Sequence, residues 1–142
     1  MTVASLAACS SAKNPNKPTS KGALDVSTNE CMQIDPKGLS PDVSKLPIID
    51  CSKPHTHQIF FTYQDTDDVF PGMTALEATA QQQCLTAFQP FVGISFVDST
   101  LFVTWIVPSL DSWNDKKDRA ILCVLGLKNG GTLTGSAQGT KL

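Results

Sequence analysis

A cysteine and two histidines lie within seven residues of one another in the stretch DCSKPHTHQIF, residues 50–60. Thiolate and imidazole groups are the usual ligands of zinc, and a cysteine beside a histidine can also form a nucleophile with its base. Cys51, His55 and His57 could hold a metal ion with one distant ligand, because two histidines two positions apart share one face of a strand. The same residues also fit a disulfide cysteine and a histidine that hydrogen-bonds nearby backbone.

Five cysteines occur in the 142 residues, and such a density is typical of small exported domains held by disulfides. If Cys9 has a separate role, four cysteines remain, and spacing alone does not choose among their three pairings. Cys84 falls on the inner face of a predicted helix and Cys123 on a strand expected beneath it. The pair Cys84–Cys123 is therefore favoured, which leaves Cys31–Cys51. A disulfide at Cys51 removes the free thiol that a catalytic pair would need.

The beginning of the chain resembles a bacterial lipoprotein signal. Leu6-Ala7-Ala8-Cys9 has the form of a lipobox, in which an apolar residue and two small residues precede the cysteine that takes the lipid. Only eight residues precede Cys9, so residues 1–9 are interpreted as a partial signal peptide whose start lies upstream. A free cysteine in a disordered leader is the alternative. Residues 10–28 are rich in Ser, Asn, Pro and Lys and are predicted to be a flexible linker.

Hydrophobic patterns beyond the linker predict one helix and a few strands. Thr74 and Glu77 have the spacing of a capping box, and the helix that follows is expected to end near residues 90–93. Its inner face is the set Leu76, Ala80, Cys84, Ala87 and Phe88. Strands are expected at residues 58–63, at 100–107 as an apolar central strand, at 119–125 with Ile121, Cys123 and Leu125 on one side, and in a short last strand at TLTGS, 132–136.

These elements predict an α+β fold with one main helix packed on a small antiparallel sheet and two disulfides, over a domain of residues 29–142. Residues 29–50 contain Cys31, three prolines and scattered aliphatic residues, and they are interpreted as an irregular segment laid over the domain. Residues 108–118 are interpreted as a polar connection built around Trp113.

Several classes of function have little support in the sequence. The net charge is −2 and no cluster of Lys or Arg occurs, which argues against binding nucleic acid. No G-x-S-x-G nucleophile motif is present, and Asp65–Asp68 resembles a calcium loop that lacks its glycine and its last carboxylate. No run approaches the ~20 apolar residues of a membrane-spanning helix. The sequence therefore predicts a protein that is not an enzyme and has no cofactor.

Several short motifs occur in a characteristic order. They are Glu30-Cys31, Asp50-Cys51-Ser-Lys-Pro54-His55, Pro71-Gly72, a helix with Cys84 and Phe88, Phe91-Val92-Gly93, Pro108-x₄-Trp113, Asp118-Arg119-x₃-Cys123 and Leu133-Thr134-Gly135-Ser136. Over about residues 29–137 the chain resembles the septum-formation domain family of actinobacterial envelope proteins. The family has a histidine at the position of His55 and requires none at His57. Asn29-Glu30 stands where the family often has a glycine.

The resemblance implies an extracytoplasmic domain associated with division or cell-wall growth, with no established catalytic residues. The leading hypothesis is a non-enzymatic domain, lipid-anchored through Cys9 at the outer face of the cell membrane, that binds a protein or cell-wall partner. Its candidate contacts are Trp113, if the ring is exposed, together with His55 and Arg119. The alternative is a lipoprotein that binds a small molecule or metal through His55 and His57. A hydrolase acting on the wall is the third hypothesis.

Overall fold

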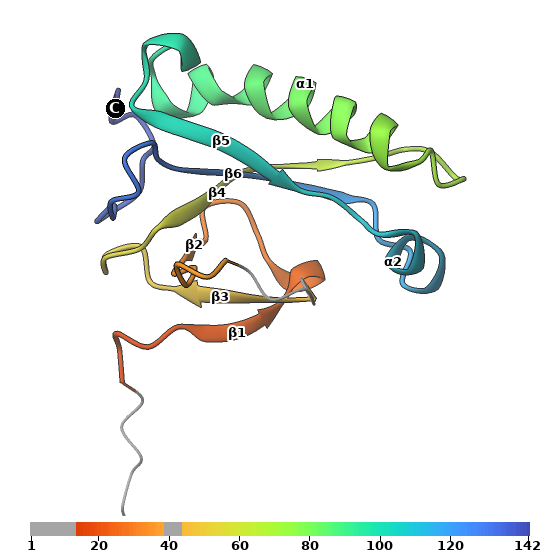
Figure 1. The fold of residues 1–142 in the computed structure, drawn as a ribbon, viewed down its shortest axis with the longest axis horizontal. Coiled ribbons are helices and arrows are strands. Elements are labelled where there is room, and N and C mark those ends of the chain that lie inside the picture. Colours follow the sequence, from red (N-terminus) through yellow and green to blue (C-terminus); the bar gives the residue numbers. More distant parts are fainter. Residues whose placement is uncertain (1–13, 39–43) are drawn as a thin grey trace, which may run out of the picture.

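The computed structural model describes residues 14–38 and 44–142, and it confirms the predicted α+β fold with one main helix and two disulfides (Figure 1). Six antiparallel strands form one sheet in the order β1-β3-β2-β4-β6-β5. The lipobox and Cys9 lie outside the described residues. The elements are β1 (Thr19–Gly22), a 3-10 turn (Ala23–Asp25), β2 (Cys31–Met32), β3 (Lys45–Ile49), β4 (His57–Gln64), α1 (Met73–Val92), a second 3-10 turn (Phe96–Asp98), β5 (Leu101–Ile106), α2 (Leu110–Asp115) and β6 (Ala120–Leu127).

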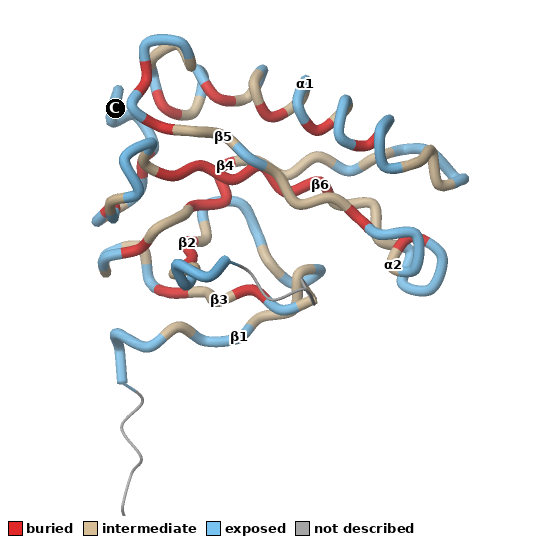
Figure 2. The backbone as a smooth tube through the Cα atoms, viewed as in Figure 1, coloured by how far each residue is buried: buried red, intermediate tan, exposed pale blue. Residues whose placement is uncertain are grey.

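Helix α1 lies across one face of the sheet, and its buried side faces the strands (Figure 2). The buried residues are Leu76, Ala80, Cys84, Phe88 and Val92, whereas Ala87 is only partly buried. The helix begins earlier than the capping-box pattern predicts, because Gly72 is the N-cap and no side chain caps the first turn. It ends at Gly93, whose φ of 91° is the left-handed conformation that glycine adopts most easily.

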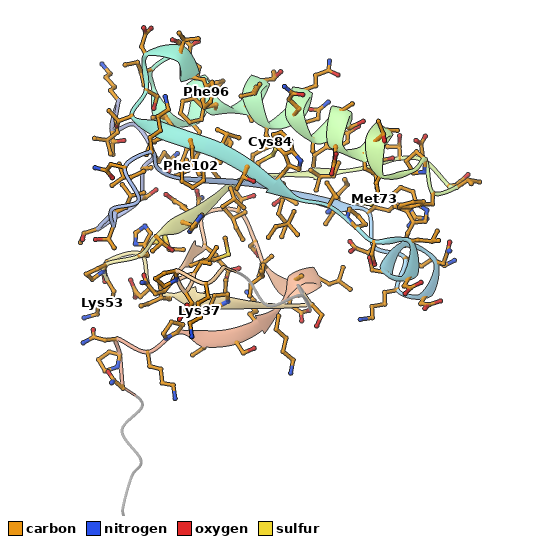
Figure 3. All side chains as sticks on the ribbon, viewed as in Figure 1. Lys37, Lys53, Met73, Cys84, Phe96 and Phe102 are labelled. Atoms are coloured by element: carbon orange, nitrogen blue, oxygen red, sulfur yellow. A yellow bond between two sulfur atoms is a disulfide. The ribbon has the colours of Figure 1, made fainter. Side chains whose placement is uncertain are left out.

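The main core lies between α1 and strands β4, β5 and β6. Ile121, Cys123 and Leu125 of β6 all point into it, as the alternation of the strand predicts. The disulfide Cys84–Cys123 joins α1 to β6 with an S–S distance of 1.97 Å. Figure 3 shows Cys84 on the side of the helix that faces the sheet. The favoured pairing of these two cysteines is therefore confirmed.

Strand β5 was expected to be central because it is apolar on both faces, but it forms one edge of the sheet. Its only neighbour among the described strands is β6. The connection after β5 is also more regular than expected. Ser109 caps the short helix α2 by accepting a hydrogen bond from the Ser112 N–H, and Ser112 returns the bond as in a capping box.

The prediction of an irregular segment over residues 29–50 is wrong, since this segment supplies strands β2 and β3. β1, within the range expected to be a linker, pairs with β3. These strands lie below β4, β5 and β6 in Figure 1 and enclose a second core on the face opposite α1. Its buried residues are Met32, Leu46, Ile59, Leu122 and Val124. The expected last strand is reduced to one bridge between His55 and Leu133.

Candidate functional site

His55 lies two residues before β4 and is completely buried, so it is not available as a surface contact. Its backbone exchanges two hydrogen bonds with Leu133, at 2.8 and 2.9 Å. The ring Nδ1 lies 2.8 Å from the carbonyl oxygen of Lys53, which can only accept, so Nδ1 carries the proton. The buried Nε2 has no hydrogen-bond partner among the described residues. His55 therefore holds together the Lys53 turn and the segment around Leu133.

Cys51, next to this turn, is bonded to Cys31 with an S–S distance of 2.06 Å, which confirms the second favoured pairing. The bond links the start of β2 to the turn that precedes His55. In the same turn the Asp50 carboxylate accepts the Ser52 N–H at 2.8 Å, and this hydrogen bond lowers the pKa of Asp50 below its ordinary value of 3.8. Because Cys51 is in a disulfide, it supplies neither a nucleophile nor a metal ligand.

His57 is in a different environment from His55. Its Nδ1 lies 2.8 Å from the Thr56 hydroxyl, and its ring meets Phe102 of β5 edge to face at a centroid distance of 5.4 Å. Partial burial lowers the pKa of His57 below its ordinary value of 6.5, because the charged imidazolium loses hydration. In the part of the chain that the structure describes, no group of three or more His, Cys, Asp and Glu residues could hold a metal ion.

Trp113 and Arg119 lie together, but their contacts are internal. The Trp113 ring is 1% exposed and donates its Nε1–H to the Asp68 carbonyl at 3.4 Å. The Arg119 guanidinium lies over this ring and donates to the carbonyls of Trp113, Asp118, Asp67 and Asp68 at 2.9–3.3 Å. The expectation that Trp113 presents an exposed ring to a partner is therefore not met. The pair fixes α2 and the Asp65–Asp68 loop against the end of β6.

The three candidate contacts do not form one surface. His57 pairs with Gly126 at one end of β4 and β6, whereas Gln64 pairs with Ala120, next to Arg119, at the other end. Seven steps along a strand correspond to roughly 20 Å. His55 and the Trp113–Arg119 pair thus lie at opposite ends of the central strands.

A groove of about 580 Å³ opens on the sheet face opposite α1, beside β5. Its walls include Ile34 and Pro36 on one side and His57, Phe102, Thr104 and Ile106 on the other. Phe102, labelled in Figure 3, lies directly over Gly126: a Cβ there would be 2.7 Å from the ring and 2.8 Å from the Thr56 carbonyl. The glycine therefore allows Phe102 to form this end of the groove.

Sequence reasoning missed this groove, and it also missed the role of Gln58. This side chain is buried, donates to the Ser136 hydroxyl at 2.9 Å and accepts the Ala137 N–H at 2.8 Å. It fixes the C-terminal segment to the centre of the sheet. The sequence does contain a sign of this role, which is a glutamine near the beginning of an apolar strand. A buried amide needs hydrogen-bond partners for both its oxygen and its nitrogen.

Comparison with known families gives one match. The family model described as septum formation matches residues 13–123, which is most of the chain, and the chain belongs to that family. This confirms the resemblance at the level of the family. No curated protein and no solved structure was found to match. Among the helices that the structure describes, none has the length and apolar character to cross a membrane.

Proposed function

We propose that this protein is a non-enzymatic, membrane-tethered domain outside the cytoplasm that binds a protein or cell-wall partner during septum formation. The observation that carries the proposal is the family match over residues 13–123. The two disulfides support an oxidising compartment, because such bonds persist mainly in exported proteins. The lipobox pattern at Cys9 supports a lipid tether.

Binding is favoured over catalysis because the reactive types of side chain are used to hold the fold together. Cys51 is oxidised, His55 is bonded to Lys53, and Arg119 donates to four backbone carbonyls. These residues stabilise the ends of the sheet and leave its apolar groove and free edge as the surfaces that a partner could contact.

In-cell crosslinking of the full-length protein, followed by mass spectrometry of the captured proteins, tests the proposal. We expect specific capture of a division or wall-synthesis component, compared with an unrelated lipoprotein that has the same type of anchor. Capture of the same bulk membrane proteins by both would contradict the proposed function.

The tether has its own test, which compares the wild type with Cys9→Ser in membrane fractions of the native cells. We expect the wild type to sediment with membranes and to incorporate a fatty-acid label, and Cys9→Ser to lose both properties. Equal sedimentation without a label would contradict lipid attachment at Cys9.

A small-molecule ligand is the second candidate function, and the groove beside His57 is the observation that favours it. Apolar pockets with a few polar groups are the usual sites for such ligands. If the ligand were a metal ion, His55 and His57 would hold it. However, His55 Nδ1 is hydrogen-bonded to the Lys53 carbonyl and Cys51 is in a disulfide, so the set of metal ligands is incomplete. Titration of the oxidised protein with zinc and copper, followed by calorimetry, tests that version, and heat in the micromolar range would support it.

A further inference from the structure

Strand β5 has a free hydrogen-bonding edge, and the register identifies which residues form it. The Lys128 N–H donates to the Thr100 carbonyl at 2.9 Å, so Thr100 and Lys128 are a hydrogen-bonded pair. Hydrogen-bonded and non-hydrogen-bonded pairs alternate along antiparallel strands. Phe102, Thr104 and Ile106 therefore bond β6, whereas the N–H and C=O groups of Val103 and Trp105 point away from it. No hydrogen bond found among the described residues occupies these outward groups.

The β5 edge also lacks the features that usually prevent a further strand from pairing. Natural edge strands are protected by charged side chains, prolines, bulges or short length. β5 has the sequence LFVTWI over six residues, with a continuous register against β6. The opposite edge differs, because β1 is only four residues long and contains Lys21, which forms an ion pair with Glu30 at 2.6 Å. Of the two edges, β5 is the one suited to accept a strand.

The groove lies beside this edge. Phe102, Thr104 and Ile106 line it, and all three are on the face of β5 that points away from α1. Side chains on neighbouring strands share a face when they lie opposite each other. Every second side chain of a strand added to β5 would therefore point into the groove, toward Ile34 and Pro36.

Charge distinguishes the two ends of β5. A second pocket of about 450 Å³ begins at Ile106. Among the described residues that line it are Asp25, Asp111, Asp115 and Asp118, and Lys116 is the one cation among them. Of the described residues that line the first groove, one is acidic, Asp35, and none is Lys or Arg. A basic residue is therefore favoured at the end of an added strand that lies next to α2.

We propose that the partner binds as an extended peptide segment that pairs with β5, with apolar residues at alternate positions and a Lys or Arg at the end beside Asp111 and Asp115. This inference rests on the proposed partner-binding function. A second copy of the chain fits less well. Its own β5 edge would bring a second concave groove to face the groove beside β5, and neither groove would be filled. A single extended segment satisfies the outward amides of Val103 and Trp105 and fills the groove at the same time.

To test this, octapeptides that bind the immobilised, oxidised full chain are selected from a random library. The affinity of the selected peptides is then compared between Thr104→Lys and the matched control Ser20→Lys on β1. Thr104 and Ser20 are both exposed edge-strand residues, so neither substitution disturbs a core. We expect peptides with alternating apolar residues and a terminal Lys or Arg. Their binding should weaken about tenfold or more with Thr104→Lys and stay unchanged with Ser20→Lys.

Hydrogen exchange of the complex with a selected peptide provides the readout that is specific to strand pairing. We expect the amides of Val103 and Trp105 to exchange more slowly when the peptide is bound, and N-methylation of alternate peptide amides to abolish this protection. Failure to select any peptide, equal binding to both variants, or unprotected Val103 and Trp105 amides would each overturn the inference.

The in-cell experiment separates this inference from the proposed function. If a division component is captured equally by wild type and Thr104→Lys, the proposed function stands and strand addition at β5 is wrong. If octapeptides bind β5 as expected but nothing specific is captured in cells, the β5 site stands and the proposed function fails. If the protein crosslinks mainly to itself through β5, the occupant is a second copy and the inference is overturned.

Discussion

The guanidinium carbon of Arg119 lies 3.7 Å from the centre of the Trp113 ring, and both side chains are held by the backbone of the Asp65–Asp68 loop. A planar cation stacks well on an indole, and its several N–H donors can serve carbonyls that point in different directions. Arg119 is the single arginine of the sequence. Its position explains how backbone carbonyls of a loop, a short helix and a strand end are joined through one side chain.

Replacing Arg119 with Lys should destabilise the fold although the charge is kept. An ammonium group cannot stack as a plane or reach four carbonyls, so we expect a loss of about 1–3 kcal/mol in the free energy of unfolding. Urea denaturation measures this loss. The control is Lys116→Ala, an exposed cation in the same connection, which should change stability by about 0.5 kcal/mol or less. A loss for Arg119→Lys as small as that for Lys116→Ala would contradict a role for the planar guanidinium.

Gly126→Ala should perturb the groove and the sheet together. The new methyl group would lie 2.7 Å from the Phe102 ring and 2.8 Å from the Thr56 carbonyl, and the second contact is with backbone. We expect a cost of roughly 1–3 kcal/mol, with shifted resonances for Phe102 and His57. Gly131→Ala is the control, because the closest atom to its new methyl group, at 2.9 Å, is the end of the Asn129 side chain and not backbone. An unperturbed Phe102 in Gly126→Ala would contradict the close packing described here.

Stability should depend on His57 below pH 6.5. Burial lowers the pKa of His57 in the folded state, so the unfolded chain takes up the proton first as the pH falls through 6.5. The unfolded state then binds more protons, and the free energy of unfolding decreases with decreasing pH. We expect His57→Gln to lose less stability than the wild type between about pH 7.5 and about pH 5.5 in urea titrations. Parallel curves for the two proteins would rule out a contribution from His57.

Of the two ring nitrogens of His55, we expect only Nδ1 to contribute to the free energy of unfolding. Asn at this position can place an amide N–H near Nδ1 and keep the bond to Lys53, and it removes the buried Nε2 that has no partner among the described residues. We expect His55→Asn to stay within about 1 kcal/mol of the wild type, and His55→Ala to lose about 2–3 kcal/mol. Thermal and urea unfolding compare the two variants. A loss for His55→Asn as large as that for His55→Ala would contradict the expectation that the Nδ1–H bond to Lys53 is what stabilises the fold.

The two disulfides should differ in how easily they are reduced. Cys84 and Cys123 are both fully buried, whereas Cys51 is partly exposed. Under limiting reductant in native buffer we expect Cys31–Cys51 to open first, as detected by alkylation and peptide mapping, because attack requires access to a sulfur. Removing either bond should cost roughly 3–4 kcal/mol in the chain-entropy model. Reduction of Cys84–Cys123 before Cys31–Cys51 would contradict the burial difference.

The helix, the three long strands and the Cys84–Cys123 disulfide could be predicted because each has a local signal, and Cys31–Cys51 followed as the remaining pair. Cys84 lies on the helical stripe with Leu76 and Phe88, and Cys123 alternates with Ile121 and Leu125, so their faces could be assigned without knowing the sheet order. The two short strands β2 and β3 have no such signal. Met32 and Leu46 are buried by strands far away in the sequence, and Pro47 lies within β3, where proline is usually a sign of irregular structure.

The candidate site was harder to predict than the fold. The types of His55, Trp113 and Arg119 suggested contacts with a partner, but the partners they have are backbone carbonyls, which sequence patterns do not show. The apolar character of β5 was correctly recognised, yet its position was not, because an apolar strand at a sheet edge and one at the centre have the same composition. The groove depends on Gly126 and Phe102 meeting across two strands, and only the register reveals that contact.

The sheet order has a consequence for the order in which the domain folds. β4 can pair with β2 without the rest of the sheet, but its other side has no neighbour until β6 is in place. Helix α1 has no complete sheet to cover until then. The apolar face of α1 and one side of β4 thus stay exposed until β6 has paired. Pairing between distant segments is slow and cooperative. The domain should therefore become resistant to proteases in a single late step, when residues 120–127 join the two halves, and not gradually from its first strand onward.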